Sequence, residues 1–579
     1  MTKLSDEIPP QEFDRGFDAS AERARRRGGD TLTGALPPTA EGDGRAATRR
    51  KGAAGSGHRK RPGRRRRVLT WTAVAVSSTV LLSAAGLYVY VKVLDSNIHA
   101  EPLHSGGPGP KTVAEKSAGG NLPINVLIIG SDSRDNSDDV SLGGSTSSVG
   151  GPPHADVEML VHISADRSNA SITSMPRDTW VQPYDCQGRQ LGHRKITETL
   201  AYGPSCVVDT WESLTHIQID HFVMLDFSGV VKMADAVGGV QVCTKENVAD
   251  YKISYDTDGE HEVGSDLVLP AGRHTIFGVQ ALEWLRTRHA WEDGTDIGRT
   301  HAQHLYLNSM IRTMKSANTL LDLGKVNALA QTATSALTVD PGLKSIEAMT
   351  SLALEFNKVP ASRVTTVTIP FDHMTAPGQS DPNNWDPALN ADSDKVFSMI
   401  ANDIPLDKGG SSTAPGASPT PSATPSGTAP AVDKASVRIS VQNAGAEGRG
   451  QQMTEHLVAA GFSAAARDTT DVTGTTQLSY PAADQAQAQA VAAALDLTPS
   501  VLKADPSVRH LVLRVGSDWP SGFDFRDTLP KQGAVPTSAV TQNAQNDSGQ
   551  CMDVYKPYQW SGTPPQVPQP AGYRPYTTP

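Results

Sequence analysis

The chain has 579 residues, of which 38% are hydrophobic, and carries a formal net charge of −10. This length and apolar content predict several folded domains and exclude a wholly disordered protein. The charge is uneven, because residues 1–67 contain 17 Lys/Arg and 9 Asp/Glu, a balance of +8, which leaves −18 for the remaining residues.

The first 67 residues are rich in Arg, Gly, Ala, Asp and Glu, and this composition predicts a disordered arm. We interpret the arm as a cytoplasmic tail and consider binding to nucleic acid unlikely, because no helix-turn-helix or aromatic-interleaved basic pattern accompanies it. Residues 68–91 contain no charged side chain and follow four arginines. They predict a single transmembrane helix over residues 68–93, with the N-terminus in the cytoplasm and all later residues outside. A cleaved signal segment is the alternative.

A folded domain is predicted over residues 121–405, after a stalk at residues 94–120. Continuous apolar runs predict buried strands at residues 125–129, 157–163 and 170–175. In an antiparallel meander, the end of the first strand, the start of the second and the end of the third share one edge of the sheet. That edge would gather Asp132, Arg134, Asp156, Arg177 and Asp178.

Periodic apolar residues predict helices near residues 207–217, 230–237, 305–314, 320–337 and 346–356. The order of strands and helices predicts an α/β fold in three layers, α/β/α, around a central mixed sheet. A Pro/Ser/Thr-rich linker follows at residues 406–435, and then a small α/β domain at residues 436–517. Residues 518–579, rich in Pro, Gln, Gly and Thr, are predicted to be disordered.

The densest group of charges lies in residues 281–303. A short apolar run leads into Arg286 and Arg288, and Arg299 and Gln303 follow. Guanidinium groups suit phosphate because each presents paired donors and stays charged. A solvated, self-neutralising surface is an equally good interpretation of this stretch alone. His301 and His304 could bind a metal with Asp296, although polar positions on a helix are the simpler interpretation.

Four cysteines are far apart in the sequence, without a CxxC pair, which argues against a structural zinc site. Disulfides are permitted outside the membrane. Cys186, Cys206 and Cys243 fall in one predicted domain and can form at most one bridge among themselves; the sequence does not say which.

Asp132 and Asp156 allow three interpretations: a magnesium site, a general acid and base, or simple neutralisation of Arg134 and Arg177. The number of arginines favours phosphoryl chemistry, in which negative charge develops on oxygen. The P-loop, GxSxG and HExxH motifs are absent from the sequence. A phosphotransferase outside the membrane needs an already activated donor, such as a lipid-linked pyrophosphate.

The chain resembles the LytR-CpsA-Psr family over residues 121–405, and residues 436–516 resemble the LytR C-terminal domain. Seven motifs occur in the family's order: residues 125–134 (NVLIIGSDSR), 155–157 (ADV), 174–181 (SMPRDTWV), 219–222 (IDHF), 236–240 (AVGGV), 286–288 (RTR) and 296–299 (DIGR). The resemblance implies a membrane-anchored phosphotransferase that moves a glycopolymer from an undecaprenyl pyrophosphate carrier to peptidoglycan. A pyrophosphate hydrolase and a non-catalytic regulator (transcriptional attenuator) are the alternatives.

The resemblance also implies residue roles. Asp132 and Asp156 match the acids that hold Mg²⁺, and one of them could act as the base. The catalytic set is Asp132, Arg134, Asp156, Arg177, Asp178, Arg286 and Arg288. Pyrophosphate would be bound by Arg134, Arg177, Arg286, Arg288, Arg299 and Gln303. One departure is Ala302, where the family has an arginine. The long loop after Asp132 leaves Asp135, Asp138 or Asp139 as alternatives for the first acid.

Overall fold

The computed structural model describes residues 64–104, 122–132, 142, 152–183, 189–256, 259–315, 323–375, 386–409, 432–467, 474–543, 550–566 and 573–578. The predicted N-terminal arm up to residue 63, most of the stalk and most of the linker lie outside these residues. Helix α1 (Arg64–Ser96) supplies nearly all of one stretch, Trp71–Asn97, that is long and apolar enough to cross a membrane, with a mean hydropathy of 1.8.

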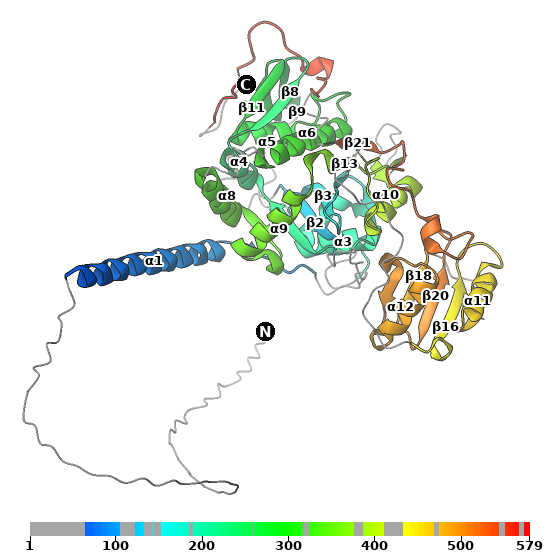
Figure 1. The fold of residues 1–579 in the computed structure, drawn as a ribbon. Coiled ribbons are helices and arrows are strands. Elements are labelled where there is room, and N and C mark those ends of the chain that lie inside the picture. Colours follow the sequence, from blue (N-terminus) through cyan, green and yellow to red (C-terminus); the bar gives the residue numbers. More distant parts are fainter. Residues whose placement is uncertain are drawn as a thin grey trace, which may run out of the picture. The chain divides into compact units, whose positions relative to one another are not determined.

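The predicted meander forms the centre of an eight-stranded sheet (Figure 1). Strand β2 (Ile124–Ser131) pairs antiparallel with β3 (Ala155–Ile163), and β3 pairs antiparallel with β4 (Ala170–Met175). The sheet is mixed, as predicted, because β7 (His221–Leu225) runs parallel to β2 and β13 (Val364–Thr368) parallel to β4. Its edges are completed by β12 (Leu337–Val339), β1 (His99–Ala100) and β21 (Val540–Asn543).

The two faces of this sheet are covered by different helices, because successive side chains of a strand point to opposite faces. Leu127 and Leu160 pack with the 3-10 helix η2 (Ile196–Tyr202), α3 (Pro204–Thr215) and α10 (Ala391–Ala401). Val126 and Val161 pack with α6 (Asp296–Lys315) and α9 (Ile346–Lys358) on the other face. The three-layer α/β/α arrangement predicted from the sequence is therefore confirmed.

A separate hydrophobic core supports the region that carries the arginines. It is built by α4 (Phe227–Ala236), α5 (Gly278–Arg286), α6, the antiparallel pair of β8 (Val240–Thr244) with β11 (Gly272–Ile276), and the hairpin of β9 (Val248–Asp256) with β10 (Gly259–Leu269). Trp284 and Trp291 are both fully buried there, with ring centroids 4.5 Å apart. Helix α8 (Leu323–Ala336) packs against α4.

The small C-terminal domain forms as predicted around a five-stranded sheet in the order β17-β16-β20-β18-β19. Its elements are β16 (Arg438–Asn443), α11 (Arg449–Ala459), β17 (Ser463–Arg467), β18 (Gln477–Tyr480), α12 (Gln485–Ala494), β19 (Leu502–Ala504) and β20 (Leu511–Val515). Trp519 and Phe525 belong to its core, so the domain extends beyond the predicted boundary at residue 517.

The start of the predicted stalk and part of the tail predicted to be disordered are packed against the folded domain. In the predicted stalk, Leu94 and Ile98 are buried, and β1 pairs with β12. In the predicted disordered tail, β21 pairs with β13, and Met552 and Val554 are buried. The prediction is wrong there because a few apolar residues, scattered among Pro and Gln, cover surface that the domain leaves exposed.

A disulfide helps to explain why the tail is ordered although its composition predicts disorder. Cys243 on β8 forms a disulfide with Cys551, which cross-links the tail to the folded domain. Cys206 is also disulfide-bonded, and its partner lies outside the described residues, as Cys186 does. Of the three cysteines predicted to share a domain, Cys243 therefore pairs outside the group, which the sequence did not indicate.

An unexpected carboxyl is buried in the central sheet. Glu158 on β3 is 1% exposed and accepts a hydrogen bond from the indole N–H of Trp211 on α3, while its Oε1 has no hydrogen-bond partner among the described residues. Burial raises the pKa of Glu158 to about 8, and the bond from Trp211 opposes this only in part. Glu158 is therefore protonated at neutral pH.

We expect Glu158 to make the protein less stable at alkaline pH. A carboxyl whose folded pKa lies above its ordinary value of 4.5 contributes stability that is present below pH 4.5 and is lost as the pH rises towards 8. Glu158→Gln keeps the acceptor for Trp211 and removes the titration. Urea unfolding at pH 5.5 and pH 8 should show that the variant loses less stability than the wild type between them, by roughly 2–4 kcal/mol. The exposed Glu347→Gln is the matched control, and equal slopes for wild type and Glu158→Gln would contradict this account.

Candidate active site

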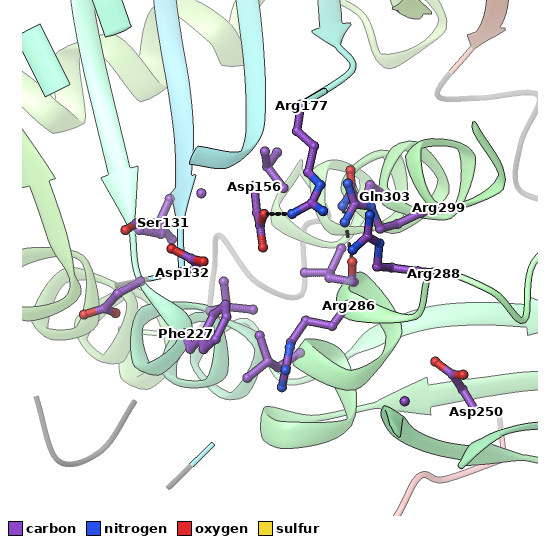
Figure 2. Close-up of a pocket in the computed structure, with 18 of the residues that line it drawn as sticks. Ser131, Asp132, Asp156, Arg177, Phe227, Asp250, Arg286, Arg288, Arg299 and Gln303 are labelled. Atoms are coloured by element: carbon purple, nitrogen blue, oxygen red, sulfur yellow. Dashed lines mark hydrogen bonds and ion pairs between the residues drawn. The ribbon is translucent and has the colours of Figure 1, made fainter. Parts of the chain in front are cut away.

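A cavity of about 390 Å³ opens where the central sheet meets α4, α5 and α6. Figure 2 shows its lining, with Arg177, Arg288 and Arg299 grouped together and Asp156 directed towards Arg177. The cavity contains most of the residues that the sequence predicted: Asp132, Asp156, Arg177, Arg286, Arg288, Arg299 and Gln303. Arg134 lies outside the described residues, as do Asp135, Asp138 and Asp139.

The two acids come from the paired ends of β2 and β3. Asp132 follows β2 directly, and its carboxylate accepts a hydrogen bond of 2.6 Å from the backbone N–H of His154. The imidazole Nδ1 of His154 lies 3.6 Å from the same carboxylate. His154 was not predicted as a site residue, although an antiparallel pairing of Asp132 with the residues just before Asp156 would have indicated it.

Asp156 is held as a carboxylate by neighbouring arginines. Its Oδ1 accepts a hydrogen bond from Nη1 of Arg177. Burial by itself raises the pKa of Asp156, but the charges of Arg177, Arg299 and Arg288 outweigh burial and lower it below its ordinary value. Asp156 therefore stays ionised at neutral pH and is a poor proton acceptor.

Asp178 does not line the cavity. It lies behind Arg177, with its carboxylate 3.8 Å from Nε of Arg177 and 3.2 Å from Nζ of Lys195. Lys195 also pairs with the buried Asp386 at 3.1 Å. The predicted catalytic role is therefore not supported by position, and Asp178 is placed to orient Arg177.

Arg286 and Arg288 leave the C-terminal end of α5, as the apolar run before them predicted. Thr287 between them is fully buried, donates from Oγ1 to the carbonyl of Glu283 at 2.8 Å, and lies 2.5 Å from the hydroxyl of Ser265. Because Thr287 is anchored inward, its two neighbours are turned towards the cavity. Arg286 lies over the ring of Phe227, 4.9 Å from its centroid, and donates to the carbonyl of Leu142 at 3.0 Å.

Arg299 and Gln303 lie one turn apart near the start of α6 and so share a helix face. The predicted helix there began too late, because the charged residues hid its first turns. Arg299 is 4% exposed, and the side-chain amide of Gln303 donates to the carbonyl of Leu285 at 3.2 Å. The same helix therefore ties the cavity to the end of α5.

Ala302 faces the second hydrophobic core and is fully buried beside Trp284, whose indole N–H donates to its carbonyl at 3.0 Å. Ala302 is not part of the cavity lining, so its side chain is not a gap in the arginine cluster.

The two histidines of α6 have separate partners and do not form a metal site together. His301 pairs with Glu292, and His304 pairs with the hydroxyl of Ser174 at 2.9 Å. Burial, and then the neighbouring His301, lower the pKa of His304 to about 3, so it is neutral. The structure does not describe the side chain of Asp296.

The cavity also contains residues that sequence reasoning missed. Asp226 and Asp250 line it, but Asp226 caps α4 by accepting from the N–H of Gly229 at 2.7 Å, and Asp250 accepts from the N–H of Ser265 at 3.2 Å. Apolar side chains complete the lining, at Val157, Leu225, Phe227, Val230, Leu282 and Leu285. No motif distinguishes these residues from ordinary core positions.

The donor set fits a magnesium ion that is shared with phosphate. Asp132 and Asp156 supply carboxylate oxygens on one wall, and Mg²⁺ binds one or two carboxylates together with phosphate oxygens and water. They are too few for an all-protein site. Among the described residues, the only group of three metal-ligating side chains within 4.8 Å is His104, Asp209 and Glu212, and none of these lines the cavity.

Comparison with known proteins gives matches in both folded regions. The profile of the LytR_cpsA_psr family matches residues 92–392, and a profile described as LytR cell envelope-related transcriptional attenuator matches residues 436–519. The chain is 28% identical over 333 residues to "Cell wall biosynthesis protein LcpA" of Corynebacterium glutamicum, which covers 53% of this chain and 60% of that protein. It therefore spans less than two thirds of that relative.

The chain is also similar to a transferase and to a solved structure. The chain is 27% identical over 264 residues to the "Polyisoprenyl-teichoic acid--peptidoglycan teichoic acid transferase TagT" of Bacillus subtilis, covering 44% of this chain and 74% of that protein. Among solved structures, the "LytR-Csp2A-Psr enzyme from Actinomyces oris" is 19% identical and covers 52% of this chain and 96% of that one, with a TM-score of 0.38. Because the family profile spans more than half of the chain, the protein belongs to the LytR_cpsA_psr family.

Proposed function

We propose that this protein is a phosphotransferase that moves a glycopolymer from a polyprenyl pyrophosphate carrier, such as undecaprenyl pyrophosphate, to peptidoglycan. The observation that carries the proposal is one cavity in which Asp132 and Asp156, at the ends of paired strands, lie together with four arginines. A pyrophosphate group would supply the negative charge that these arginines neutralise. The names of related proteins, a cell wall biosynthesis protein and a teichoic acid transferase, agree with it.

The reaction that we propose exchanges one P–O bond for another. A hydroxyl of peptidoglycan attacks the phosphorus that carries the glycopolymer, its O–H proton leaves, and the bond to the bridging oxygen breaks. Polyprenyl phosphate departs with the electron pair of that bond. Arg177, Arg288 and Arg299 would stabilise the equatorial oxygens, while Arg286 lies on the other side, over Phe227.

We assign the proton acceptor to Asp132 in preference to Asp156. Asp156 is ion-paired with Arg177, and its pKa is lowered, which makes it a weak base. Asp132 accepts a hydrogen bond from the backbone N–H of His154, and the ring Nδ1 of His154 lies 3.6 Å from its carboxylate, where it would pass the proton on. A magnesium ion bound by Asp132 and Asp156 would neutralise phosphate charge and hold the pyrophosphate against this wall. The pKa of Asp156 favours that role, since a metal ligand must be deprotonated.

The proposed location is the outer face of the cell membrane. Helix α1 would be the anchor, and the arginines at its N-terminal end, Arg64, Arg65, Arg66 and Arg67, would stay in the cytoplasm. This arrangement would place the cavity on the side where peptidoglycan is built, and the disulfide between Cys243 and Cys551 is compatible with that oxidising side.

The arginines of the cavity should contribute far more to turnover than an exposed control arginine does. With full-length protein in detergent, a synthetic polyprenyl pyrophosphate glycan and a peptidoglycan fragment, we expect Arg288→Ala and Arg299→Ala each to lower kcat/KM for linked product by about a hundredfold. Arg438→Ala, exposed on β16, should leave it unchanged. Release of free phospho-glycan without linkage would show a hydrolase, and lipid binding without turnover would favour a regulator and refute the transferase.

Magnesium dependence should follow the two acids. We expect chelation to abolish turnover, and Asp132→Asn and Asp156→Asn to raise the Mg²⁺ concentration for half-maximal rate by roughly tenfold or more, because each loses one anionic ligand. Asp178→Asn, behind Arg177, should lower the rate without changing that concentration. Equal Mg²⁺ titrations for wild type and Asp156→Asn would show that the ion does not bind there.

A further inference from the structure

Residues 551–555 lie beside β8 and beside the connection between Arg288 and Arg299. This segment begins at Cys551, which is bonded to Cys243. The N–H of Met552 donates to the carbonyl of Cys243 at 2.9 Å, and the N–H of Lys245 donates to the carbonyl of Met552 at 2.9 Å. Residues 551–552 therefore extend alongside the end of β8.

The same segment then pairs with residues 290–292. The N–H of Glu292 donates to the carbonyl of Asp553 at 2.9 Å, and the N–H of Tyr555 donates to the carbonyl of Ala290 at 2.8 Å. Trp291 and Val554 form the antiparallel bridge between these two bonds. Both side chains are buried in the second core. The segment is thus joined by backbone hydrogen bonds to residues that begin two positions after Arg288.

Residues 289–295 connect the two arginines, because Arg288 precedes them and α6, with Arg299 near its start, follows them. They are confined on both sides. The ring of Tyr555 lies so close to Gly294 that a Cβ there would be 3.1 Å from it, and a Cβ at Gly298 would be 2.9 Å from the carbonyl of Trp291. A displacement of this connection would therefore move Arg288 and Arg299 relative to each other.

We propose that residues 551–555 are a positioning element for the phosphate-binding arginines, held in place by the Cys243–Cys551 disulfide. This inference rests on the proposed function. Two guanidinium groups clamp one pyrophosphate only while their spacing is kept to within a fraction of an ångström. In this protein, that spacing depends on a short connection whose outer side is covered by a segment more than 250 residues later in the chain. Releasing the disulfide would free this cover while the central sheet stays folded.

The first measurement is amide hydrogen exchange of the full-length protein in detergent. We expect Cys243→Ser/Cys551→Ser to speed exchange over residues 287–299 by at least about tenfold. Exchange in the strands β2, β3 and β4 should be unchanged. Asp553→Asn is the matched control, because it removes only the exposed ion pair with Lys245 and keeps the backbone bonds. Unchanged exchange over residues 287–299 in the double serine variant would overturn the proposal.

The second measurement compares the change in KM with the change in kcat. The double serine variant should raise KM for the lipid pyrophosphate by roughly tenfold or more, with a smaller change in kcat, because the clamp loosens while the acids keep their place on the sheet. Tyr555→Ala should also raise KM. Tyr555→Phe, which keeps the ring against Gly294, should retain the wild-type KM. Equal effects of the Phe and Ala variants would contradict a packing role for the ring.

Reduction provides an independent comparison. A reductant should reproduce the KM change in the wild type and have no further effect on KM in the double serine variant, which separates this disulfide from the one that contains Cys206. A wild-type protein that neither binds nor turns over the lipid pyrophosphate would refute the proposed function. The exchange experiment would still decide whether the tail holds residues 287–299.

Discussion

The antiparallel pairing of β2, β3 and β4 is the constraint on which the rest of the site depends. In this pairing, Gly130 lies opposite Val157 and Glu158 lies opposite Met175. The residues just beyond these pairs, Asp132 and Arg177, must therefore come together with Asp156 at one edge. The strands are buried on both faces, so a slip of one residue would move every side chain to the opposite face and misfit both packed cores. Burial of the strands thus sets the position of the charges at their ends.

The second half of the site is attached to a different core. Arg286, Arg288 and Arg299 depend on the packing of α5 and α6 around Trp284 and Trp291. This core is completed by residues from the C-terminal tail, Met552 and Val554 among them. The cavity lies between a wall fixed by sheet register and a wall fixed by helix packing. Because the two walls rest on different cores, a substitution in one core can displace the arginines and leave the acids in place.

Two carboxyls on β3 show how the surroundings decide the ionisation state. Asp156 and Glu158 are two residues apart, and both are removed from water to a large extent. Asp156 faces three guanidinium groups and is a carboxylate, with its pKa lowered. Glu158 has the indole N–H of Trp211 as its hydrogen-bond partner and is neutral, with its pKa raised to about 8. The cavity thus keeps a negative charge at Asp156, where a cation would bind, and Glu158 adds none to the core beside it.

The sequence by itself determined the meander, the three layers, the small second domain and the membership of Asp132, Asp156, Arg177, Arg286, Arg288, Arg299 and Gln303 in one site. The fold elements and the charges at their ends follow from local signals: apolar runs have the period of strands or helices, and charges occur where those runs end. The grouping of Arg286, Arg288, Arg299 and Gln303 with the two acids came from the family resemblance. Only the tertiary structure decided what depends on distant neighbours. Asp178 proved to face Lys195, Ala302 proved to face a core, and Glu158 proved to be a buried acid. The tail was the largest surprise, because its average composition predicts disorder. A disulfide and a few buried apolar side chains order it through contacts with residues about 300 positions away in the chain, and no local pattern records such contacts.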